Sequence, residues 1–193
     1  MSSRRITWGV AVLGTLALAF GALGIAGAAK RTKTKTFSSG NVSAPIVDDD
    51  GATFVKVNVG KRGKVKDVNL SLRLDHTDLG DVEFYLLSPG GKSLHFWEND
   101  NPSTSDEDFG TGSNSCAGSK TTFDDEASDD FGDLDGAPAG HVGRFEPPHG
   151  SLSTFDRTKM QGAWWLAVID DVGGDDGDVG CVQLKIKYKK TRG

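Results

Sequence analysis

The stretch VKDVNLSLRLDHT, residues 65–77, decides the fold class of this chain of 193 residues. Its apolar residues Val68, Leu70, Leu72 and Leu74 alternate with polar ones, which is the period of a β-strand with one buried and one solvated face. The stretch CVQLKIKYKK, residues 181–190, has the same alternation. Two long strands of this kind predict a sheet that covers a hydrophobic core with one of its faces.

Shorter apolar runs predict further strands on either side of these two. They are FVKVNV (54–59), VEFYLL (82–87), SLHFW (93–97) and WWLAVI (164–169). The turn signals VGKRGK, SPGGK and GGDDGD separate them, and 26 glycines suit a chain with many turns. We therefore expect one all-β domain, either a sandwich or a barrel-like fold, with Trp97, Trp164 and Trp165 packed in its core.

The N-terminal 29 residues have the organisation of an export signal. Arg4 and Arg5 precede an uncharged apolar stretch, which ends in the small residues Ala26, Gly27 and Ala28. This order is typical of a cleaved signal peptide and predicts a secreted protein. The alternative is an uncleaved membrane anchor, because residues 6–29 are long enough to span a bilayer. The basic stretch KRTKTKT (30–36) is interpreted as a linker, residues 37–188 as the folded module and residues 189–193 as a basic tail.

The two cysteines, Cys116 and Cys181, are expected to pair, because two thiols in one small exported domain usually form a disulfide. The alternative is two separately buried thiols.

Three acidic segments lie at predicted loop positions. Calcium binds six to eight oxygens, mostly from carboxylates, carbonyls and water, and a site made from several loops needs such clusters to converge. The alternative is that these aspartates cap turns and stay solvated. The segments contain Asp75, Asp78 and Asp81; Asp124, Asp125 and Glu126; and Asp170, Asp171 and Asp175.

Four stretches together resemble a known family. They are HTDLGDVEFYLLSPGG (76–91), TTFDDEA (121–127), GRFEPPHGSLSTFDRTKMQGAWWLAVIDDVGGDDGDVG (143–180) and LKIKY (184–188). Their order and spacing resemble the P domain, or Homo B domain, which follows the subtilisin-like catalytic domain of the proprotein convertases. The sequence departs from the family pattern at Arg157, where a glycine is usual, and at Val182, where a tryptophan is usual.

The resemblance implies a jelly-roll sandwich of about eight strands that supports a serine endopeptidase without a catalytic triad of its own. It also places the family's acidic hallmarks on Asp81, Asp124, Asp125, Asp170 and Asp175. These five residues are the calcium ligands that we expect. A secreted subtilisin-like protease or a cell-surface component is the expected partner.

The remaining residues exclude several other functions. No nucleophile motif accompanies the four histidines, and we expect His76 to be a hydrogen-bonded structural residue and His95 to pack on Trp97 or a neighbouring strand. A net charge of −5 without a basic, aromatic-rich patch argues against nucleic-acid binding. A carbohydrate- or cell-wall-binding module is the alternative function, and exposed coplanar aromatic rings on one sheet would favour it. A hydrolase is a third, less favoured class.

Overall fold

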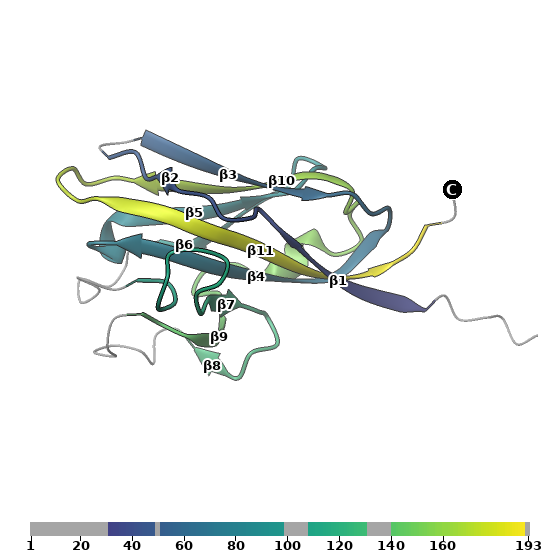
Figure 1. The fold of residues 1–193 in the computed structure, drawn as a ribbon. Coiled ribbons are helices and arrows are strands. Elements are labelled where there is room, and N and C mark those ends of the chain that lie inside the picture. The colour runs from purple at the N-terminus through teal and green to yellow at the C-terminus, as the bar shows by residue number, and fades with distance from the viewer. Residues whose placement is uncertain (1–30, 49–50, 99–107, 131–139, 192–193) are drawn as a thin grey trace, which may run out of the picture.

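Two β-sheets pack face to face in the computed structural model, which describes residues 31–48, 51–98, 108–130 and 140–191. Figure 1 shows the two layers as an elongated sandwich. In the described part of the chain the helices are short 3-10 turns, and none is long enough to cross a membrane. The prediction of an all-β sandwich is confirmed.

The larger sheet contains both of the long alternating stretches. Its strand order is β1–β11–β4–β7–β9–β8, and β2 pairs with the first part of β11. The antiparallel pair β11–β4 runs from Gly177 opposite His76 to Lys189 opposite Lys64. The bounds are β1 (Thr32–Ser38), β2 (Ala44–Pro45), β4 (Lys64–His76), β7 (Thr121–Phe123), β8 (Asp129–Asp130), β9 (Gly143–Glu146) and β11 (Gly177–Lys189).

The smaller sheet has the antiparallel order β3–β10–β5–β6. The described residues form eleven strands rather than about eight, because β2, β7 and β8 are additional strands of two or three residues. The bounds are β3 (Gly51–Val59), β5 (Val82–Leu87), β6 (Ser93–Trp97) and β10 (Gly162–Asp170), and the 3-10 turns are η1 (Leu79–Asp81) and η3 (Leu152–Phe155).

The core lies between the sheets and is rich in aromatic rings. Trp164 is fully buried, packs edge-on against Phe155 with ring centroids 5.1 Å apart, and donates its indole N–H to the Met160 carbonyl at 2.9 Å. Each large side chain buried in this way contributes about 1.5–3 kcal/mol. The buried cluster extends from Phe37 to Tyr188. Residues 30–193 therefore contain the whole described core and every described strand.

The predicted linker, residues 30–36, is corrected by the structure. Its residues from Thr32 onward belong to β1, which pairs with β11 in an unbroken antiparallel register from Thr32 opposite Lys189 to Ser38 opposite Gln183. Alternating Lys and Thr can form an edge strand because the backbone supplies the hydrogen bonds, and Phe37 anchors it in the core. The folded module thus begins before Phe37.

The sandwich separates its charges by sign. Both β1 and the end of β11 lie at the right-hand end in Figure 1, whereas the β10–β11 loop lies at the left-hand end. We call the left-hand group the acidic end: Asp48, Asp75, Asp78, Asp81, Asp170, Asp171, Asp175, Asp176 and Asp178. We call the right-hand group the basic end: Arg31, Lys33, Lys35, Lys61, Arg62, Lys64, Lys66, Arg157, Lys159, Lys185, Lys187, Lys189 and Lys190.

Candidate functional site

A buried histidine and aspartate lie at the centre of the acidic end. His76 ends β4 and Asp170 ends β10, so the pair joins the two sheets. Both side chains are fully buried, with His76 Nε2 3.3 Å from Asp170 Oδ2. The other ring nitrogen, Nδ1, lies 2.6 Å from the Asp78 carbonyl oxygen. The prediction that His76 is a hydrogen-bonded structural residue next to the DLGD loop is confirmed.

Both ring nitrogens of His76 have hydrogen-bond partners. Nε2 faces Asp170 Oδ2, and Nδ1 lies beside the carbonyl oxygen of Asp78 and 3.2 Å from the Asp78 backbone N–H. Burial raises the pKa of Asp170, against the lowering effects of the Val172 N–H and of His76 itself. Because both nitrogens are occupied in this way, His76 is positioned to hold the two sheets together rather than to activate a nucleophile.

Three further carboxylates, those of Asp78, Asp81 and Asp175, lie near this pair. Asp78 caps η1 by accepting the Gly80 N–H at 2.7 Å, and Asp175 accepts the Thr77 hydroxyl at 2.7 Å. Burial, the charge of Asp78 and a side-chain contact with Asp175 raise the pKa of Asp81. Among the described side chains no cation pairs with Asp81 or Asp175. Two expected calcium ligands, Asp81 and Asp175, are therefore in contact, and the charge of Asp170 also acts on Asp81.

The other two expected ligands, Asp124 and Asp125, have protein donors as partners. Asp124 is fully buried and receives two N–H groups of Arg144, one of them at 2.9 Å. Burial alone would raise the pKa of Asp124, but the hydrogen bonds from Arg144 and from the Glu126 backbone hold it below its ordinary value. Asp125 accepts the backbone N–H groups of Leu152 and Ser153 at 2.8 and 2.7 Å, and so fixes the start of η3.

The five predicted ligands do not converge on one point. Asp124 follows β7, whose Phe123 is opposite Leu70, six residues before His76 on β4. At about 3.3 Å per residue this places the two groups about 20 Å apart along the strand. One ion could not reach both groups, so the single five-residue site is corrected to two separate clusters. No three Asp, Glu, His or Cys side chains among the described residues form a ready-made metal centre.

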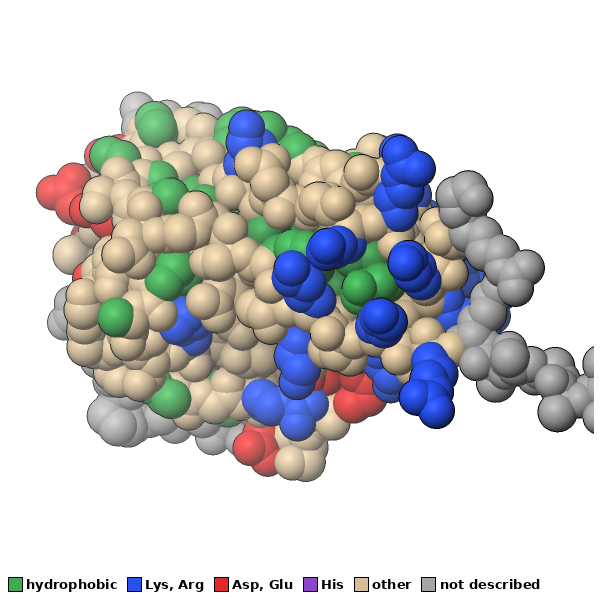
Figure 2. All heavy atoms as spheres, turned by 45° about the vertical axis from the view of Figure 1, so that its right-hand side comes forward, with side chains coloured by type: hydrophobic (Ala, Val, Ile, Leu, Met, Phe, Trp, Pro, Cys, Tyr) green, Lys and Arg blue, Asp and Glu red, His purple; other side chains and the backbone are tan. Residues whose placement is uncertain are grey.

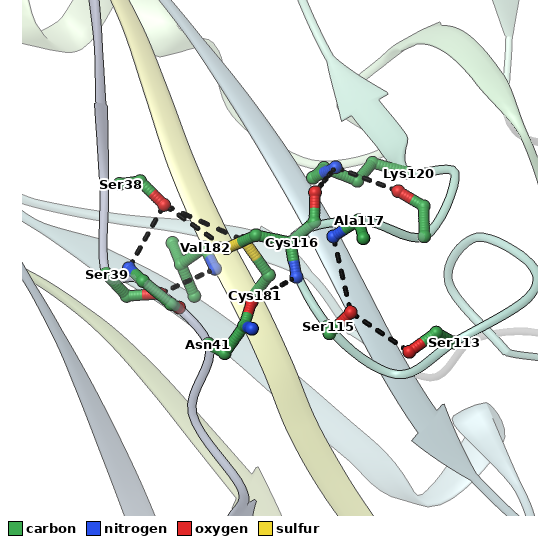
Figure 3. Close-up of a disulfide and its surroundings, with 12 residues drawn as sticks. Ser38, Ser39, Asn41, Ser113, Ser115, Cys116, Ala117, Lys120, Cys181 and Val182 are labelled. Carbon is green, nitrogen blue, oxygen red and sulfur yellow. Dashed lines mark hydrogen bonds between the residues drawn. A yellow bond between two sulfur atoms is a disulfide. The ribbon is translucent and has the colours of Figure 1, made fainter.

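The predicted disulfide between Cys116 and Cys181 is present, with the Cα atoms 5.0 Å apart. It fastens the loop before β7 to β11, where Cys181 follows a register shift in the β11–β4 pair. Figure 3 shows Ser38 beside the bridge, with its Oγ 3.3 Å from the sulfur of Cys116. The loop also needs Gly180, because a Cβ there would lie only 1.9 Å from Asn114 Oδ1.

An aromatic group on the outer face of the smaller sheet was missed from the sequence. Trp97 and Trp164 are buried as expected, but Trp165 is only half-buried, because adjacent residues of a strand point to opposite faces. Phe54, 56% exposed, packs edge-on against Trp165 with an interplanar angle of 87°. His95 stacks on Tyr85 of the neighbouring strand at 4.3 Å, as one of its expected arrangements.

A carboxylate lies beside this outer aromatic group. The hydroxyl of Tyr85 donates to Glu83 Oε2 at 2.6 Å. This hydrogen bond, with a smaller effect of burial, raises the pKa of Tyr85 to about 12. We call Phe54, Tyr85, Leu87, Trp165 and Ile169 the outer apolar face. The alternation of the three strands places all five on the same side of the sheet.

Comparison with known proteins gives a likeness in fold. No protein-family model and no curated protein sequence matches the chain. A chain in the crystal structure of the Aeromonas sobria serine protease with the chaperone matches at a TM-score of 0.54 and 16% identity, over 83% of this chain and 28% of that one. The structure of the A. sobria serine protease gives 0.53 and 15%, over 82% and 27%. This chain thus spans less than a third of the length of each of these two chains.

Proposed function

We propose that this chain is a secreted, non-catalytic module of the P-domain type that docks on a serine endopeptidase of the subtilisin class and stabilises it. One comparison carries the proposal: about four-fifths of this chain matches less than a third of a serine protease chain. A fold of this kind can thus be one part of a larger protease, and the P-domain-like motifs point in the same direction. Fold alone does not give function, so the proposal needs a docking surface.

The outer apolar face is the surface that we assign to this partner. Phe54 is among the few large apolar side chains that are more than half exposed in the described residues, and it lies on the edge strand β3 beside Trp165 of β10. Exposed aromatic residues next to a polar rim are typical anchors of protein interfaces. Lys56, 5.3 Å above the Trp165 ring, and Glu83 supply such a rim.

The ring geometry favours a protein over a carbohydrate on this face. Sugar-binding platforms present the flat faces of aromatic rings in one plane, but Phe54 and Trp165 stand at 87° to each other. Tyr85 and His95 cover one face of each other. A carbohydrate- or cell-wall-binding function therefore remains the second candidate.

Calcium is part of the proposed function at the acidic end only. Asp81 and Asp175 are in contact without a paired cation among the described side chains, and a divalent ion there would relieve their repulsion. Backbone carbonyls and water would have to complete the six to eight oxygens. Asp124 and Asp125 do not fit an ion equally well, because Arg144 and η3 already occupy their oxygens.

The experiment uses a matched pair of surface variants. Immobilised protein is exposed to the medium of the source organism, and bound serine hydrolases are labelled with a fluorophosphonate probe. We expect the wild type and Val142→Asp to retain a labelled protease, and Phe54→Asp to lose it. Val142 is the control because it is 53% exposed, close to the 56% of Phe54, but lies before β9.

Two results would reject the proposal. One is the absence of any labelled protein on the wild type, and the other is equal capture by Phe54→Asp. Labelling of this chain itself by the probe would instead support the hydrolase class. Pelleting of the chain with purified cell wall, lost in Phe54→Asp, would support the carbohydrate-binding candidate.

A further inference from the structure

The basic end is a dense patch of positive charge on a protein of net charge −5. Thirteen of the 22 lysines and arginines lie there, and all are exposed except Lys66, which is half-buried. Figure 2 turns this end toward the viewer and shows the blue side chains gathered on it, with acidic side chains at its lower border and at the left-hand edge of the view. The net charge therefore conceals a strongly polarised molecule.

The strands arrange part of this patch as a regular row. Lys185, Lys187 and Lys189 are exposed on the outer face of β11, spaced about 7 Å apart because successive residues on one face of a strand are two positions apart. The exposed threonines of β1 lie opposite them in register, with Thr36 beside Lys185 and Thr34 beside Lys187. Ammonium groups alternate with hydroxyls across a flat surface, a pattern suited to phosphate oxygens.

Two surface depressions continue the row around the end of the sandwich. They share Lys64 and Thr191, and Arg62, Lys159, Lys66 and Lys190 complete most of their lining. The carboxylates near this end include Asp67, opposite Lys187, and three that act on its charge, Asp124, Asp125 and Asp156. These four still leave the thirteen basic residues with a large positive excess.

The chain itself indicates which anionic partner faces this end. Residues 6–29 form an uncharged apolar segment that leads through Lys30 directly into Arg31, the first residue of the basic end. On both interpretations of this segment, signal peptide or anchor, the chain would leave the bilayer at this point. The basic end would then be the part of the module nearest to the lipid surface during export, and the acidic end, at the opposite end of the sandwich, would be the farthest from it.

We propose that the basic end docks on an anionic lipid surface, with the phospholipid headgroups over the β11 lysines and the two depressions. The attraction of basic residues to anionic lipids acts within a Debye length and orients a polarised protein. The acidic end then points away from the membrane, where the sites proposed above stay accessible. This inference does not depend on the identity of the protease partner.

The test uses residues 30–193, which contain every described strand and the whole described core, and vesicles of phosphatidylcholine with or without 30% phosphatidylglycerol. Sedimentation is measured in chelator, so that calcium cannot bridge the protein to the lipid. We expect the protein to pellet with the anionic vesicles and not with the neutral ones, and to be released by 0.5 M salt, which shortens the Debye length to about 4 Å.

A pair of triple variants separates the patch from the net charge. The variant Lys185→Gln, Lys187→Gln, Lys189→Gln removes three charges and should weaken partitioning by on the order of 100-fold. The control Val47→Glu, Ala52→Glu, Val172→Glu changes the net charge equally, but at exposed positions near the acidic end. It should partition like the wild type. Thermal unfolding of both variants confirms that they are folded.

Three outcomes would overturn the proposal. The first is equal binding to neutral and anionic vesicles, and the second is an equal loss of binding in both triple variants. The third is tighter binding to double-stranded DNA than to the anionic vesicles at the same salt concentration, which would assign the patch to a nucleic acid.

Discussion

The two ends of the sandwich differ in the sign of their charge and also in how that charge is built into the fold. At the acidic end, Asp170 and His76 are fully buried and hydrogen-bonded across the two sheets. At the basic end, Lys185, Lys187 and Lys189 project into solvent from one strand face. Changes to charges of the first kind alter the stability of the fold, because a buried group depends on its partner, whereas charges of the second kind serve mainly for attraction over distance. The comparison predicts stability changes at one end and binding changes at the other.

The largest effect is expected from the disulfide that fastens the loop next to the acidic end. The variant Cys116→Ser, Cys181→Ser should lower the free energy of unfolding by about 4 kcal/mol, because the bridge closes a loop with a sequence separation of 65 residues. Urea unfolding of the oxidised wild type and the variant measures the difference. Equal midpoints would mean that the loop is held by its hydrogen bonds alone.

The buried pair gives the next largest effect. His76→Ala leaves Asp170 without its partner and should cost about 3 kcal/mol at pH 7. The cost should be smaller near pH 4, where Asp170 takes up a proton and no longer carries a buried charge. Lys187→Ala is the counterpart at the basic end and should change stability by less than about 0.5 kcal/mol. A similar loss in both variants would contradict the contrast between the ends.

Calcium should stabilise the protein through the acidic end alone. At an ion concentration 100 times the Kd, the gain would be about 2.7 kcal/mol, or about 5–10 °C in Tm. Asp81→Asn and Asp175→Asn should reduce this gain, whereas Asp124→Asn should keep it and lower the stability of the chelated protein as well. Calorimetry in chelator and in millimolar calcium measures these shifts. The calcium proposal fails if the wild type has the same Tm in both.

The pH dependence of the chelated protein distinguishes the two clusters of carboxylates. The pKa values of Asp81 and Asp170 are raised in the folded state, mainly by burial. Their contribution to the free energy of unfolding is therefore most favourable at a pH below the pKa of the unfolded state, and it is lost as the pH rises through the pKa of the folded state. Asp124 has the opposite sign, and its contribution is lost as pH falls. We expect the variant Asp81→Asn to gain Tm relative to the wild type at pH 7, and Asp124→Asn to lose it; a common direction would be inconsistent with these shifts.

The smallest effect is expected at the basic end, where Arg157 stands at a position usually occupied by glycine in the family that the sequence resembles. Among the described residues it is the one non-glycine with a positive φ, 63°. Arg157→Gly relieves the left-handed conformation but increases the entropy of the unfolded chain, so the net gain should be at most about 1 kcal/mol. A clear loss of Tm would show that the arginine side chain itself contributes to stability.

The sequence by itself determined the sheet architecture and the cysteine pairing. The strands VEFYLL and SLHFW coincide with β5 and β6, because alternation is a local property of the chain. Two cysteines in one small domain, behind a segment that is typical of an export signal, left few possibilities. The role of His76 could also be predicted, since its position at the end of a strand next to an acidic turn is written in the sequence.

Only the tertiary structure decided which charges meet. The acidic loops look alike in the sequence. The strand register places Asp124 beside Arg144 and Asp170 beside His76, and these two pairs lie about 20 Å apart. In the same way, basic residues from β1, β4, β11 and two loops gather at one end of the sandwich although they are scattered along the chain. Strand alternation predicts which face a side chain occupies, whereas strand order and register, which depend on non-local pairing, decide its neighbours.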